Sequence, residues 1–134
     1  MVGIFGKSFK NEKTNYLRSK KSELKKLVKE KKYDSVLKVG LEILEKNPHD
    51  LDVLFVLGGL HYMKRKFLKA ISFFDKVLEI SEFDPEVLLL KANSHYKLGQ
   101  YKKSLICCEK IKEIDPKNKG VSILLAKIPK NSVN

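Results

Sequence analysis

Apolar residues recur along most of this chain at the spacing of an α-helix. In the stretches 36–44 and 70–80 they return every three or four residues, with polar residues between them. This spacing places apolar side chains on one face of a helix, whereas a strand would show strict alternation. The pattern therefore predicts helices and an all-α fold.

The helical pattern repeats every 34 residues. An aromatic residue occurs at Tyr33, Phe67 and Tyr101, and each stands three residues before a small or branched residue. Three consecutive units follow from this register: 17–50, 51–84 and 85–118. Each unit accommodates two helices of about thirteen residues and a turn, and such a hairpin buries its apolar face only by stacking on a neighbour. The sequence therefore predicts stacked helical hairpins.

Local features support this register. Asp84, Pro85 and Glu86 form a strong helix start, because a capping carboxylate precedes a proline and then an acid that the helix dipole favours. Small residues recur where the two helices of a hairpin would cross. They are Gly58 and Ala92 on first helices and Ala70 and Ser104 on second helices. Phe67 and Tyr101 are expected to fill the turn end of each hairpin.

These residues resemble the pattern of the tetratricopeptide-repeat family. The unit 51–84 matches best, through Leu54, Leu57, Gly58, Ala70 and Phe74. The unit 85–118 keeps Leu88, Ala92, Gly99, Tyr101 and Asp115-Pro116. The unit 17–50 is degenerate, with Lys20, Glu23 and Leu24 at the first pattern positions, but Tyr33, Ile43 and Asn47-Pro48 anchor it. The resemblance implies an α-solenoid of three hairpins and a C-terminal capping helix in a short right-handed superhelix.

The expected organisation has six parts. They are a basic, partly flexible N-terminal segment 1–16, a degenerate capping repeat 17–50, repeats 51–84 and 85–118, a capping helix 119–129, and a tail 130–134. The capping helix is expected to bury Val121, Leu124, Leu125 and Ile128, and Pro129 ends it. The polar first unit is expected because the terminal repeats of a stack must present one polar face.

The net charge of +12 is concentrated at the two ends of the chain. Residues 1–32 contain eleven Lys and Arg against three Glu, whereas residues 33–116 contain thirteen of each sign. A basic helix of this kind could bind the phosphates of nucleic acid, and this remains the alternative function. Arg18 and Arg65 are the only arginines, although specific recognition favours arginine, so we interpret the lysines first as a solvated capping face.

Several classes of function are not predicted. The chain has no apolar run long enough to span a membrane, and the start MVGIFGKSFK is too short for a secretory signal, so we expect a cytoplasmic protein. No phosphate-binding loop, nucleophile elbow or metalloprotease motif occurs. His61 and His95, one repeat apart, are expected to pack rather than bind metal, and neighbouring Cys107 and Cys108 to be buried thiols. We therefore predict no enzyme, cofactor or metal.

The family resemblance implies that the first helix of each hairpin lines a concave groove that binds a peptide of another protein. When the repeats of this sequence are aligned with the family pattern, the expected groove residues are Lys21, Lys25, Lys29, Phe55, Val56, Tyr62, Met63, Leu89, Leu90, Asn93, Tyr96 and Lys97. The groove would be lysine-rich at one end and apolar and aromatic along the rest. Its predicted partner is a protein segment with apolar anchors and an acidic end. An alternative is that Tyr62 and Tyr96 are simply core residues.

Two further possibilities concern the partner. The best-known groove of the family grips the acidic tails of heat-shock chaperones, and Lys21 matches one lysine of that clamp. The other four clamp positions hold Lys25, Val56, Glu86 and Leu90, so a chaperone tail is not the expected ligand. Ile4, Phe5 and Phe9 belong to no repeat, and they could fill the groove of the same or a neighbouring molecule, which would give a homo-oligomer.

Overall fold

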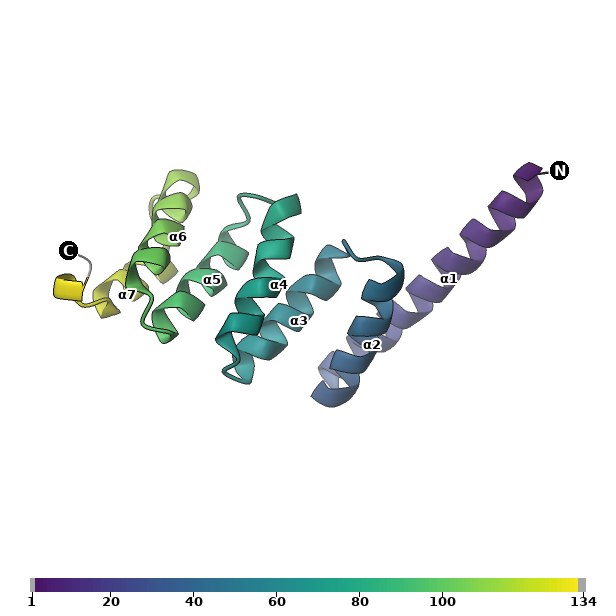
Figure 1. Cartoon of the computed structure of the whole chain (residues 1–134), viewed down its shortest axis with the longest axis horizontal. Coiled ribbons are helices and arrows are strands. Elements are labelled where there is room, and N and C mark those ends of the chain that lie inside the picture. Colours follow the sequence, from purple (N-terminus) through teal and green to yellow (C-terminus); the bar gives the residue numbers. More distant parts are fainter. Residues whose placement is uncertain (1, 133–134) are drawn as a thin grey trace. The chain divides into compact units, whose positions relative to one another are not determined.

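The computed structural model describes the backbone of residues 2–132 and the side chains of residues 11–131. Over that range the chain is helical and contains no strand, which confirms the all-α class. The elements are α1 (Val2–Lys29), α2 (Tyr33–Lys46), α3 (Leu51–Met63), α4 (Phe67–Ile80), α5 (Pro85–Lys97), α6 (Tyr101–Ile114), α7 (Lys119–Lys127) and the 3-10 helix η1 (Lys130–Ser132) (Figure 1). The chain divides into two compact units, Met1–Val53 and Leu54–Asn134.

The first unit is a helical hairpin of α1 and α2. Its core consists of Leu24 on α1 and of Val36, Val39 and Ile43 on α2, all of which are buried. The repeat register begins at residue 17, but α1 is one continuous helix that already begins at Val2. An ion pair of 3.0 Å between Lys20 Nζ and Glu42 Oε2 links the two helices at a position where the family pattern expects an apolar residue.

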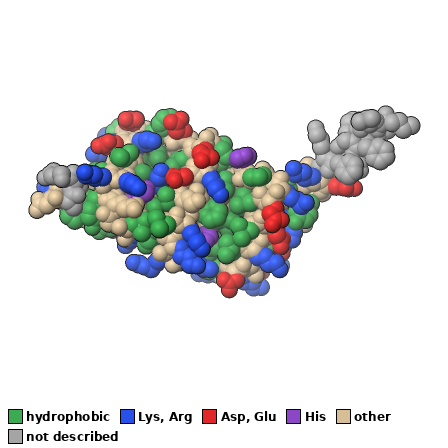
Figure 2. Space-filling view, in the orientation of Figure 1, with side chains coloured by type: hydrophobic (Ala, Val, Ile, Leu, Met, Phe, Trp, Pro, Cys, Tyr) green, Lys and Arg blue, Asp and Glu red, His purple; other side chains and the backbone are tan. Residues whose placement is uncertain are grey.

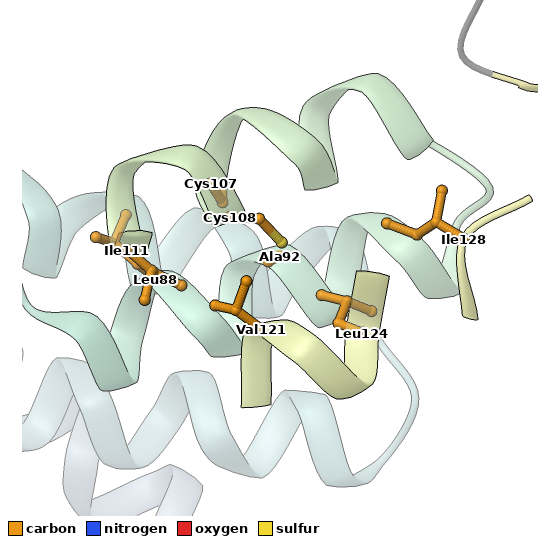
Figure 3. Packing of buried hydrophobic residues seen from close by; sticks show 8 residues of the cluster. All are labelled: Leu88, Ala92, Cys107, Cys108, Ile111, Val121, Leu124 and Ile128. Carbon is orange, nitrogen blue, oxygen red and sulfur yellow. The ribbon is translucent and has the colours of Figure 1, made fainter. Parts of the chain in front are cut away.

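The second unit stacks its helices in sequence order. Helix α4 packs against α5, α5 against α6, and α7 against both α5 and α6. In Figure 1, α4 and α6 lie toward the viewer, with α5 and α7 behind them. The C-terminal core cluster consists of Leu88, Ala92, Cys107, Cys108, Ile111, Val121, Leu124 and Ile128, whose side chains converge in Figure 3. Helix α7 thus buries Val121 and Leu124 as the sequence pattern predicts.

Close helix crossings depend on the predicted small residues. A Cβ atom at Gly58 would lie 2.5 Å from Cε1 of Phe74, so only glycine fits opposite that ring. In the next hairpin the Ser104 hydroxyl donates a hydrogen bond of 2.8 Å to the carbonyl oxygen of Ala92. Ala70, Ala92 and Ser104 are all fully buried. The small residues that recur every 34 positions therefore lie where the helices cross, as the sequence predicts.

The turns repeat as regularly as the helices. A residue with positive φ follows the end of α1, α3 and α5 by two positions: Lys31 at 57°, Arg65 at 61° and Gly99 at 73°. The next amide donates back to a carbonyl five residues earlier, from Lys32 to Leu27, Lys66 to His61 and Gln100 to His95. This is the Schellman geometry that satisfies the last carbonyls of a helix. The backbone thus keeps the same turn even where the residue is not glycine.

Helix starts repeat in the same way. The side chains of Asp50, Asp84 and Asn118 accept hydrogen bonds from the first amides of α3, α5 and α7. Asp84 accepts from both Glu86 N and Val87 N, at 3.0 and 3.2 Å, with Pro85 in the first turn. This confirms the helix start predicted at residues 84–86. Because the caps fix where each first helix begins, they also fix which of its residues face outward.

Candidate functional site

Helices α3 and α5 each carry a stripe of partly exposed residues opposite the stripe that fills the core. On α3 the core stripe includes Leu54, Leu57 and His61, and on α5 it includes Leu88, Ala92 and His95. The opposite stripes, which we call the first-helix strip, contain Phe55, Val56, Tyr62 and Met63 on α3 and Leu89, Leu90, Asn93, Tyr96 and Lys97 on α5. None of these residues is fully buried, and Met63 is 59% exposed.

The two tyrosines of the strip have a structural role as well as an exposed surface. The ring of Tyr62 meets that of Phe67 edge-on at a centroid distance of 5.5 Å. Tyr96 and Tyr101 form the equivalent pair at 5.9 Å. Burial raises the pKa of the Tyr62 hydroxyl, although the nearby Arg65 lowers it. Both tyrosines are half-buried, so each closes the turn end of its hairpin while part of its surface stays exposed.

Backbone and side-chain packing shape the rest of the strip. Leu89 packs against the C-terminal core cluster, and it lies so close to Gly120 of α7 that a Cβ atom there would collide with it. A Cβ atom at Gly59 would instead have no neighbour within 4 Å. Asn93 donates from its side chain to the carbonyl of Leu89 at 2.9 Å. The open surface of the strip therefore lies mainly around Phe55, Gly59 and Leu90.

The predicted lysine-rich end belongs to the first unit. Lys21 Nζ lies 3.1 Å from Asp50 Oδ2 and 3.1 Å from Asp52 Oδ2. Burial lowers the pKa of Lys21, but the hydrogen bonds to Asp52 and Asp50 outweigh this effect and leave the pKa raised. Lys25 and Lys29 are exposed and form no ion pair with described residues. Two of the three predicted lysines are therefore open to a ligand, while Lys21 already has two carboxylates.

Other cations of the first unit are also neutralised locally. Lys20 contacts Glu42 at 3.0 Å and Glu23 at 3.6 Å, and Lys32 contacts Glu30 at 3.0 Å. Lys20 and Lys46 also lie over the ring of Tyr16. These contacts reduce the positive potential that could attract a polyanion. The side chains of Ile4, Phe5 and Phe9 lie outside the described residues, so self-association through them stays a prediction.

The histidines and cysteines are packed into the hairpins. His61 and His95 are buried, and His61 stacks on Phe73 at a centroid distance of 5.2 Å. Burial lowers the pKa of His95, and burial raises the pKa of Cys107 and that of Cys108, the latter to about 11. Among the described residues, no three His, Cys, Asp or Glu side chains are placed to hold one metal ion. No helix in the described part of the chain is both long and apolar enough to cross a bilayer.

The structure also contains a furrow that sequence reasoning missed. It runs between α4 and α6, has residues of α5 in its floor, and encloses about 500 Å³. Two departures from the repeat could have indicated it. Lys91 replaces the equivalent of the buried Leu57, and Cys107 replaces the equivalent of Phe73. We call this feature the α4–α6 furrow.

Comparison with known proteins places the chain in a family. A family model described as "Anaphase-promoting complex, cyclosome, subunit 3" matches residues 29–111. No curated protein matches the chain. Among solved structures, the first TPR domain of Spaghetti (RPAP3) bound to the HSP90 peptide SRMEEVD is similar, with a TM-score of 0.77, 16% identity and coverage of 88% of this chain and 94% of that chain.

Two other solved structures are also similar. The Arabidopsis OM64 TPR domain has a TM-score of 0.76 and 14% identity, over 88% of this chain and 98% of that chain. MamA AMB-1 has a TM-score of 0.69 and 24% identity, over 85% of this chain but only 61% of that chain. At these identities the structural likeness establishes the fold. The chain therefore consists of tetratricopeptide repeats, and it belongs to the family described as anaphase-promoting complex, cyclosome, subunit 3.

Proposed function

We propose that this chain is a non-enzymatic interaction module that binds a peptide segment of a partner protein along the first-helix strip. The observation that carries this proposal is the exposed apolar surface of α3 and α5. Met63 is 59% exposed, and Phe55, Val56 and Leu90 remain partly exposed although the opposite stripe completes the core. Exposed apolar and aromatic side chains grouped on one face are typical of protein interfaces.

Structural neighbours support this class of function. The first TPR domain of Spaghetti is bound to an HSP90 peptide, and the second TPR domain of human RPAP3 is in complex with the HSP70 peptide SGPTIEEVD. The same kind of ligand, a short peptide segment of a partner protein, would fit the strip proposed here. Its sequence would differ, because Val56, Glu86 and Leu90 occupy positions that hold polar clamp residues in chaperone-binding members.

The proposed ligand has apolar anchors and an acidic end. Phe55, Val56 and Leu90 would contact the anchors, and the open surface beside Gly59 leaves room for the ligand backbone. Of the predicted groove lysines in the first unit, Lys25 and Lys29 are exposed and available to an acidic ligand, whereas Asp50 and Asp52 already balance the charge of Lys21. Hot spots of such interfaces are few, so loss of two anchors should remove most of the binding energy.

Affinity capture from an extract of the source cells tests this proposal. The intact chain should retain a set of proteins that the double variant Phe55→Asp, Leu90→Asp loses. Because both residues are partly buried, circular dichroism must show that the variant keeps its helices. Met63→Asp, at a more exposed position, provides a milder second variant that should weaken the same interactions. An unchanged set of captured proteins with both folded variants would contradict the proposal.

A further inference from the structure

The α4–α6 furrow has α4 and α6 as its two walls and residues of α5 in its floor. Its lining repeats along each helix at three- and four-residue intervals. The lining residues are Leu68, Ile71, Asp75, Leu78 and Glu82 on α4 and the turn after it, Leu88, Lys91 and His95 on α5, and Gln100, Lys103, Ile106, Cys107 and Lys110 from α6 and its start. Its buried lining residues are the apolar Ile71, Leu88 and Cys107 together with His95. All of these residues belong to the second unit.

The furrow exists because one repeat lacks a large side chain that the preceding repeat has. Phe73 fills the space beside His61, with ring centroids 5.2 Å apart. One repeat later the equivalent residue is Cys107, and His95 instead makes a 2.7 Å hydrogen bond from Nδ1 to Gln100 Oε1. Lys91, at the position of Leu57, reaches Asp75 at 2.7 Å and keeps a quarter of its side chain exposed. The smaller Cys107 side chain leaves an open trough between α4 and α6.

Two aliphatic side chains stand exposed on opposite walls of this trough. Leu68 on α4 is 67% exposed and Ile106 on α6 is 55% exposed. In the neighbouring repeats the equivalent positions hold Lys102 and Ser72, so the fold itself does not require apolar residues there. Surface aliphatic residues beside an apolar trough indicate an interaction site.

The two walls carry opposite charge. The α4 side contributes Asp75 and Glu82, and the α6 side contributes Lys103 and Lys110. Asp75 also forms an ion pair with Lys91 of α5. Figure 2, in the orientation of Figure 1, shows acidic and basic side chains among hydrophobic ones on the face toward the viewer, where α4 and α6 lie. A complementary ligand must therefore present an apolar stripe between a basic flank and an acidic flank.

We propose that the α4–α6 furrow is a second docking surface and that it binds an amphipathic helix of a partner protein, with one acidic and one basic flank. A helix fits because the ridges of α4 and α6 bound a groove of about 20 Å, the length of about fourteen helical residues. This surface is separate from the first-helix strip.

Synthetic helices test the charge pattern. Three labelled peptides of about eighteen residues, long enough to form helices, share one leucine stripe. One has a Glu flank and a Lys flank, one has two Glu flanks, and one has two Lys flanks. Fluorescence anisotropy with the intact chain should show the mixed peptide binding at least about tenfold more tightly than either other peptide at low salt. In the variant Lys103→Glu, Lys110→Glu both walls are acidic, so the peptide with two Lys flanks should become the preferred ligand.

Substitution of exposed apolar residues by Asp tests where the peptide binds. Ile106→Asp should weaken binding of the mixed peptide by at least about tenfold. The matched control is Ile80→Asp, because Ile80 is 49% exposed and does not line the furrow. This control and the double variant Phe55→Asp, Leu90→Asp should leave the affinity unchanged, which separates this site from the first-helix strip. Circular dichroism checks the fold of each variant.

Several results would overturn the proposal. They are no binding of the mixed peptide, equal binding to folded Ile106→Asp, or an unchanged preference after the two lysine substitutions. Sedimentation of the chain alone, which measures its oligomeric state, can give a further contradicting result. If the chain forms a dimer that Ile106→Asp dissociates, the furrow is occupied by a second copy and not by a partner helix.

Discussion

At the scale of single residues, two adjacent glycines of α3 have opposite surroundings. Gly58 faces the ring of Phe74 and the Cβ atom of Phe73, whereas Gly59 faces open space on the first-helix strip. Glycine is otherwise a poor helix residue, so each must be explained by what a side chain would contact. Close packing against Phe74 explains why residue 58 is a glycine. At Gly59 no neighbour requires a glycine, and its effect is to leave the helix backbone uncovered there.

This difference predicts opposite effects of the same substitution. Gly58→Ala should lower the free energy of unfolding by about 1–2 kcal/mol, because its Cβ atom would lie 2.5 Å from the fully buried Phe74 ring. Gly59→Ala should raise it by about 0.5–1 kcal/mol, because alanine favours the helix and meets nothing. Urea denaturation followed by circular dichroism measures both. Equal effects of the two substitutions would show that the crossing at Gly58 is not as close as described.

Lys31, Arg65 and Gly99 show how the repeat determines backbone geometry. All three have a positive φ, between 57° and 73°, although only one is glycine. A lysine or arginine in this conformation costs about 1–2 kcal/mol. The cost is offset because the two Schellman hydrogen bonds and the packing of the following aromatic residue require this turn. Residue type therefore indicates this turn at Gly99, but only the structure reveals it at the other two positions.

At the scale of elements, side-chain caps define the start of three helices. Asp50, Asp84 and Asn118 are 34 residues apart and accept the same kind of hydrogen bond. The cap at Asp84 was recognisable from the sequence because Pro85 and Glu86 follow it. The caps at Asp50 and Asn118 lack the proline, but the repeat register places them at equivalent positions.

The cap of α5 can be tested with two substitutions. Asp84→Ala should reduce the free energy of unfolding by about 1 kcal/mol, because two amides at the start of α5 lose their acceptor. Asp84→Asn should preserve most of the stability, since Asn118 makes the same bond in the next repeat. Thermal and urea unfolding of both variants give the comparison. If the two variants lose the same stability, the charge of Asp84 matters more than its capping bond.

Most of the helices and many buried residues could be predicted from the sequence. Leu54, Ala70, Phe74 and Ile111 were recognisable because they return in phase with the period, and all four are buried. The start of α1 was not predicted, because residues before 17 have no repeat to compare with. The residues of the first-helix strip could be predicted from the family resemblance together with helix periodicity. The α4–α6 furrow was not predicted, because a cavity depends on the volume of side chains from three helices.

At the scale of the whole molecule, the net charge of +12 does not show how many cations are free to bind an anion. Lys20, Lys21 and Lys32 in the first unit each contact a carboxylate, whereas Lys25 and Lys29 are exposed. A net charge counted from the sequence therefore overestimates the number of cations that can bind phosphates. The remaining cations would attract a polyanion only through weak, screened interactions.

This distribution predicts weak and salt-sensitive binding to nucleic acid. Any retention of RNA or duplex DNA in a filter-binding assay should fall to background between about 50 and 200 mM salt. Lys25→Glu with Lys29→Glu should weaken what remains at low salt, because these two cations are exposed and the substitutions reverse their charge. Lys32→Glu, at a cation already paired with Glu30, serves as a control and should have a smaller effect. Tight binding at physiological salt would favour the nucleic-acid function instead.

The sequence by itself determined the period, the helices and the inward-facing residues, because these depend on spacing within one helix or one repeat. A buried position returns every 34 residues whatever lies around it, so comparison of the repeats is enough to find it. The tertiary structure alone decided the state of Lys21 and the presence of the α4–α6 furrow. Lys21 is neutralised by carboxylates about thirty residues away, and the furrow opens where Cys107 is too small to fill the space between helices. Such features arise from distances and volumes between elements, which the spacing of residues within one helix does not determine.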